Sequence, residues 1–165
     1  MNTNICLPIT AFELKGYNGN FIKLTITEVS DFPKEIVYGG GYQACGDLDI
    51  CIESYSVHTT HHFTTGELYI LYTELSKCYE KVKGEAKLDN IEKAFFMTLI
   101  FEKDGKISVS GVLQTKPHEG NKLYFEMFTD QTFISQVIND LEKINSIFGN
   151  LNGVNIISKE NNSLT

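Results

Sequence analysis

The chain contains no arginine and no tryptophan among its 165 residues, so all 14 of its basic side chains are lysines. Arginine is the usual residue for bidentate contacts with phosphate groups and guanine edges. Its absence, together with a formal net charge of -7, argues against a nucleic-acid partner. An acidic surface instead attracts a basic partner over long range, although a negative charge also simply keeps a protein soluble.

Long apolar runs are missing as well. No segment approaches the about 20 consecutive apolar residues that a helix needs to span a bilayer. The first 16 residues lack the basic and apolar regions of a secretion signal, so we expect a cytoplasmic protein without a membrane contact. The four cysteines show no close pairing pattern, which is typical of free thiols in a reducing compartment. They are Cys6, Cys45, Cys51 and Cys78.

The composition that remains is that of an ordinary globular protein, with 42% hydrophobic and 21% charged residues. The length is sufficient for one domain with a substantial core. No internal repeat and no linker interrupts it. We therefore predict a single domain over residues 1–149, followed by a polar tail, 150–165, that we expect to be flexible.

Runs in which apolar and polar residues alternate, or in which both faces are apolar, predict six strands. These runs cover residues 11–15, 21–29, 46–57, 92–103, 106–114 and 122–128. Residues 58–63 lie between the third strand and a helix and are expected to form a solvated loop. Gly111 interrupts the fifth strand, where it would make room for a close neighbour.

Two helices are predicted by their capping residues and their apolar stripes. Thr64 with Glu67 three residues later fits a capping box, and Gly84 is expected to end that helix. Thr129 or Asp130 can cap the second helix, which Gly149 ends. The order is β-β-β-α-β-β-β-α, which predicts an α+β fold: an antiparallel sheet of about six strands with both helices packed on one face.

The third predicted strand carries an acidic face formed by Asp47, Asp49 and Glu53. Neighbouring carboxylates can act as a general acid and base, bind a divalent metal ion, or dock a basic partner. They are most often a solvated surface, and docking is the more interesting alternative. Cys51 shares this face, but adjacent carboxylates raise the pKa of a thiol and so oppose its activation as a nucleophile. We predict no catalytic residues.

His58, His61 and His62 fall within five residues, close to Cys45 and Cys51. Histidine and thiolate are good zinc ligands, but the spacing matches no structural zinc pattern. Adjacent residues of a strand also point to opposite faces, so His61 and His62 would not easily share one ion. We predict no metal site and no cofactor. A small metal-binding or hydrolytic module, using these histidines with the acidic face, is the alternative hypothesis.

Gly39, Gly40 and Gly41 form a run that lacks the Lys-Ser/Thr pair of a phosphate-binding loop and does not lead into a helix. It is interpreted as a flexible loop or bulge. Cys78 falls on the apolar stripe of the first helix, which favours a core position over a reactive one.

The second half of the chain resembles the WapI family of bacterial immunity proteins over about residues 64–148. The most specific part is the Asp-Gln-Thr-aromatic-aliphatic step that follows a Phe-Glu strand. The matching positions are Leu68, Tyr69, Tyr72, Leu75, Tyr79, Gly84, Ala86, Gly105, Ile107, Val109, Gly111, Gly120, Asn121, Leu123, Phe125, Glu126 and the run 130–134. The first third of the chain departs from the pattern, because it lacks the tryptophan-containing segment of many members.

This resemblance implies a cytosolic protein that binds and neutralises, without catalysis, the toxic C-terminal domain of a cognate bacterial toxin, often a nuclease. The matched positions determine the fold, so no toxin-contacting residue follows from them. The departing first third is where we expect the specificity, and tyrosine is enriched at protein interfaces. The candidate contact residues there are Asp47, Asp49, Glu53, Tyr42 and Tyr55.

Overall fold

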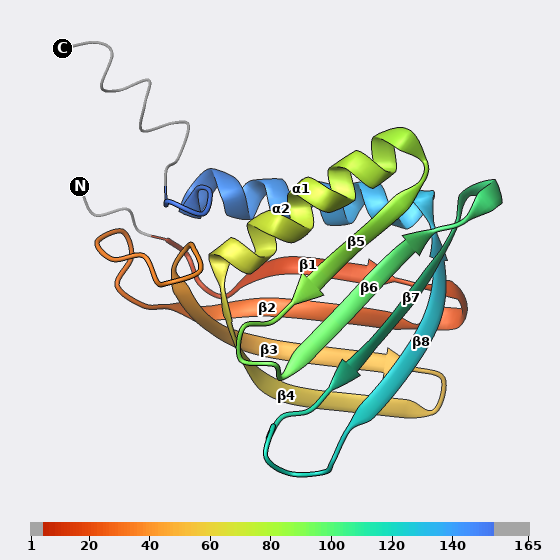
Figure 1. Ribbon diagram of the computed structural model, residues 1–165, viewed down its shortest axis with the longest axis horizontal. Helices are drawn as coiled ribbons and strands as arrows, with labels where there is room; N and C mark the ends of the chain where they lie inside the picture. Colours follow the sequence, from red (N-terminus) through yellow and green to blue (C-terminus); the bar gives the residue numbers. More distant parts are fainter. Residues whose placement is uncertain (1–4, 154–165) are drawn as a thin grey trace.

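The computed structural model describes residues 5–153 and shows the same order of elements twice: four antiparallel strands followed by a helix (Figure 1). The first unit comprises β1 (Ile9–Lys15), β2 (Phe21–Val29), β3 (Gln43–Ile52), β4 (Tyr55–Thr64) and α1 (Thr65–Lys81). The second comprises β5 (Gly84–Asp89), β6 (Phe95–Phe101), β7 (Lys106–Leu113), β8 (Leu123–Asp130) and α2 (Gln131–Phe148).

Each set of four strands forms its own sheet, with neighbours along the chain paired throughout. The α+β class and the antiparallel pairing are thus confirmed. The expected count of about six strands in one sheet was approximate, since eight strands form two sheets. Helix α1 packs beside β5, α2 packs beside β1, and the helices pack on each other, so both lie on one side of the molecule. The strands at the other edges, β4 and β8, contact helices mainly where they lead into α1 and α2.

A single core joins the two sheets and the helices. Its members come from both sheets and both helices. Examples, each at most 1% exposed, are Leu24 of β2, Leu99 of β6, Leu71 of α1 and Leu141 of α2. The predicted core position of Cys78 is confirmed. Close packing also explains why position 111 of β7 is a glycine, because an added Cβ would overlap the Phe125 ring and the carbonyl of Phe96.

Two strands were missed in the sequence. The predicted strand 46–57 is in fact the hairpin of β3 and β4, so the expected loop at 58–63 is wrong. Thr59 and His61 occupy inward positions of β4. Because threonine and histidine are polar, residues 55–64 do not show the apolar–polar alternation that would predict a strand. Strand β5 is short and points only Ala86 and Leu88 into the core. Helix α1 ends at Lys81, and its C-cap is Val82 in the left-handed conformation (φ 55°). The prediction of Gly84 as the C-cap is therefore wrong, because Gly84 begins β5.

The segment after α2 packs on the glycine loop that precedes β3. The Gly41 amide donates to the Leu151 carbonyl oxygen (2.8 Å), and the Leu151 side chain leaves no room for a Cβ at Gly40. Residues 150–153 therefore contact the domain, and the rest of the predicted tail, 154–165, lies outside the described residues.

The capping box of α1 is confirmed and extended. The Thr64 amide donates to Glu67 Oε2 (2.7 Å), and the Glu67 amide donates to Thr64 Oγ1 (3.1 Å). Glu67 Oε1 also accepts from the Ile91 amide (2.6 Å) and from Asn90 Nδ2 (3.0 Å), which ties the helix to the β5–β6 connection. Burial raises the pKa of Glu67, although these hydrogen bonds favour its charged form.

Replacing Glu67 with glutamine is expected to lower the free energy of unfolding by about 2 kcal/mol. Both carboxylate oxygens of Glu67 accept hydrogen bonds, so the NH₂ group of glutamine would face a buried N–H donor and leave it without an acceptor. Glu74→Gln is the matched control on the same helix. Glu74 accepts from the Lys87 amide (2.7 Å) at an exposed site, where water can replace it. Urea unfolding of both variants checks this, and equal losses would contradict a special role of Glu67.

Candidate protein-binding surface

The outer face of β3 and β4 carries two of the three carboxylates of the predicted acidic face, Asp47 and Asp49. Inward positions of β3 are buried, so Asp47 and Asp49 point to the other side of the sheet. Across the ladder, Asp47 lies opposite Thr60 and Asp49 opposite His58. We call Asp47 and Asp49 the acidic face. On the other neighbouring strand, Lys23 is the partner of Asp49 in the register, so a positive charge also adjoins this face.

One charge of the acidic face is already engaged. His58 Nδ1 lies 2.5 Å from Asp49 Oδ1, and this hydrogen bond raises the pKa of the exposed imidazole. At pH values below the raised pKa the pair is therefore a cation bonded to a carboxylate. Asp49 is accordingly less available to a partner than an unpaired carboxylate would be.

The other two histidines of β4 lie on opposite faces of the strand, as the sequence predicted. His61 is only 4% exposed and its ring lies 5.7 Å from the ring centroids of both Phe63 and Phe95, whereas His62 is exposed. Burial lowers the pKa of His61 to about 4, so this side chain is neutral at physiological pH.

The residues of the alternative hypothesis do not gather around one point. Within residues 5–153, no group of three histidine, cysteine, aspartate or glutamate side chains is placed to hold a metal ion. Cys45 lies opposite His62 and Cys51 opposite Ser56 on the outer face, while His61 points into the core. The described residues thus give the metal-binding hypothesis no ligand set.

The two candidate tyrosines have different surroundings. Tyr42 is 3% exposed, and its ring centroid lies 4.9 Å from that of Phe32 and 6.5 Å from that of Phe148. It is a core residue, which corrects its selection as a contact residue, because a buried ring has no surface to offer a partner. Tyr55, at the start of β4, is 65% exposed and remains a candidate.

Glu53 leaves the acidic face to which the sequence assigned it. It lies in the tight turn between β3 and β4, in the left-handed conformation (φ 54°), and its amide donates to Asn20 Oδ1 (2.9 Å). The turn directs Glu53 to the rim of a cavity of about 160 Å³ between the β3–β4 hairpin and β8. We call this cavity the hairpin cleft.

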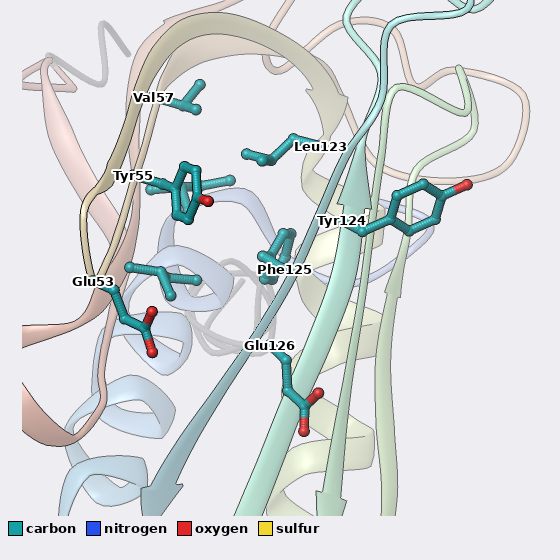
Figure 2. A pocket seen from close by; sticks show the side chains of 9 residues that line it. Glu53, Tyr55, Val57, Leu123, Tyr124, Phe125 and Glu126 are labelled. Atoms are coloured by element: carbon teal, nitrogen blue, oxygen red, sulfur yellow. The ribbon is translucent and has the colours of Figure 1, made fainter.

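The hairpin cleft has apolar walls and a charged rim. Figure 2 shows Val57 and Tyr55 facing Leu123 and Phe125 of β8, with Glu53 at one end of the cleft. Glu126 borders the cleft from β8, but its side chain leaves the strand on the outer side, as does Tyr124. Ile50 and Ile52 complete the apolar lining.

Sequence reasoning missed the β8 side of this cleft. Alternation along residues 122–128 places Phe125 and Glu126 on opposite faces of the strand, and in the structure Phe125 is buried and Glu126 is exposed. Nothing in that pattern indicates which other strand faces them. Their meeting with the β3–β4 turn depends on how the two sheets pack.

A model of the Immunity protein WapI-like family matches residues 13–149, which is most of the chain. The chain belongs to this family. The match begins in β1 and thus extends beyond the expected range of about residues 64–148 into the first third of the chain.

A similar solved structure is the CdiA-CT/CdiI toxin and immunity complex from Enterobacter cloacae, at 15% identity and a TM-score of 0.40. The similarity covers 70% of the WapI-like protein and 94% of the other chain. No curated protein matches. Neither described helix of the WapI-like protein has the length and apolar character needed to cross a membrane.

Proposed function

We propose that this protein is a cytosolic immunity protein that binds the toxic C-terminal domain of a cognate bacterial toxin and neutralises it by occupying its surface. The observation that carries the proposal is the family match over residues 13–149. In the proposal the residues up to 149 act as one domain, and the partner is a protein rather than a nucleic acid or a membrane.

The charge of the chain supports a basic toxin domain as partner. A net charge of -7 without any arginine favours long-range attraction to a positively charged protein. Nucleases need basic surfaces to bind their substrates, so a nuclease is the toxin class that fits best.

Inhibition without catalysis agrees with the surroundings of the reactive side chains. The Cys78 thiol is buried, and burial raises its pKa, which disfavours the nucleophilic thiolate. His61 is held neutral within the core, and His58 is bonded to Asp49. None of these arrangements presents an activated nucleophile beside a base.

The proposal is tested by co-expression with the toxin domain encoded by the gene immediately upstream. We expect a one-to-one complex on co-purification and rescue of cell growth. The association rate should fall about 10-fold or more between low and high salt, because steering by charge is screened. An immunity protein paired with an unrelated toxin is the control. Absence of both a complex and growth rescue would refute the proposed function.

A further inference from the structure

The hairpin cleft combines an apolar recess, exposed aromatic area and carboxylates on two separate elements, the β3–β4 turn and β8. We propose that it is the toxin-contacting site, and that it takes one apolar side chain from a basic segment of the toxin domain. Lysine or arginine residues that flank this side chain would bind Glu53 and Glu126. This inference rests on the proposed function.

The recess has the size of one large side chain. Its volume is about 160 Å³, which is close to the about 150 Å³ of an apolar cavity that binds benzene. A phenyl or isobutyl group therefore fits it. Ile52 and Phe125 are almost fully buried, but Val57 and Leu123 are only half-buried, so a bound side chain would remove further apolar surface from water.

The charges at the rim are free to accept a cation. Glu53 and Glu126 are exposed, and within residues 5–153 neither forms an ion pair. They come from the two elements that border the cleft, the β3–β4 turn and β8. A buried apolar anchor with a polar rim is the usual arrangement of a protein interface.

Tyr55 adds contact area beside the recess. It is 65% exposed and faces into the cleft, whereas Tyr124 points away from it (Figure 2). Tyrosine is among the residues that carry most of the binding energy at interfaces. The acidic face offers less, because Asp49 is already bonded to His58.

Two double variants decide between these surfaces. Glu53→Lys with Glu126→Lys alters the cleft, and Asp47→Lys with Asp49→Lys alters the acidic face, while the net charge changes equally. Isothermal titration calorimetry against the upstream-encoded toxin domain measures each Kd. We expect the cleft variant to bind about 30-fold or more weakly than wild type, and the face variant within about threefold.

A third variant tests the recess without any change of charge. Val57→Trp fills the cleft and is expected to weaken binding about 10-fold or more. Thermal unfolding verifies that all three variants are folded, and light scattering reports the oligomeric state of the free protein.

The possible outcomes separate the two proposals. If wild-type protein binds no toxin domain, the proposed function itself fails. If wild type binds but the face variant alone loses affinity, the toxin site lies on the acidic face and the cleft inference is overturned. A dimer of the free protein that Val57→Trp dissociates would also overturn it, because a second copy would then occupy the cleft.

Discussion

Replacing Gly41 with alanine is expected to lower the free energy of unfolding by about 2 to 5 kcal/mol. Gly41 adopts φ +74°, where a residue with a Cβ costs about 1–2 kcal/mol. The added Cβ would also overlap the amide nitrogen of Gly66 and lie 2.5 Å from Thr65 Oγ1. Both atoms belong to the first turn of α1, which cannot yield easily, so overpacking adds about 1–3 kcal/mol.

The reason is that the glycine run fastens the loop before β3 to the start of α1. The Tyr42 amide donates to Thr65 Oγ1 (2.8 Å), and the Thr65 amide donates to the Tyr42 carbonyl oxygen (2.9 Å). From the other side, a Cβ at Gly66 would overlap the Gly40 carbonyl. The loop that the sequence describes as flexible is thus a close backbone contact.

Gly105→Ala is the matched control for this prediction. Gly105 has φ +76°, almost the same as Gly41, but no atom lies within 4 Å of an added Cβ. Its replacement is expected to cost only the conformational part, about 1–2 kcal/mol. Chemical denaturation measures the free energy of unfolding of both variants. The difference between their losses is the cost of the steric overlap at Gly41. Equal losses would show that the loop moves aside freely.

Acidification is expected to destabilise the protein through His61. Its pKa is about 4 in the folded state and about 6.5 in the unfolded chain, so the unfolded state takes up a proton first as the pH falls. The contribution of neutral His61 is complete above pH 6.5 and is lost progressively between about pH 6.5 and pH 4. The difference of about 2.5 pH units corresponds to about 3 kcal/mol.

His61→Phe removes this dependence and preserves the aromatic packing against Phe63 and Phe95. Its free energy of unfolding should therefore fall less than that of wild type between pH 7 and pH 4, by about 3 kcal/mol. His58→Gln is the contrasting control. The raised pKa of His58 stabilises the fold at low pH, so its removal should steepen the acid loss instead. If the free energy of unfolding falls equally with pH in wild type and in His61→Phe, His61 is not the cause of the acid destabilisation.

The amino-acid sequence by itself determined the parts of the fold that depend on neighbours along the chain. The capping box of Thr64 and Glu67, the stop at Gly149, and the strands β2, β7 and β8 follow from local hydrogen bonding and from the period of the apolar residues. The sequence offered Thr129 or Asp130 as the cap of α2, and the structure shows Asp130. The family could likewise be identified from motifs within one half of the chain.

Only the tertiary structure decided which surfaces meet. Alternation assigns Glu126 to one face of β8, but no local pattern says that the β3–β4 turn, some 70 residues away, places Glu53 beside the same cleft. The burial of Tyr42 and the contact of Gly41 with α1 were hidden for the same reason. Period and propensity fix the direction of a side chain relative to its own element, whereas burial depends on which distant element packs over it.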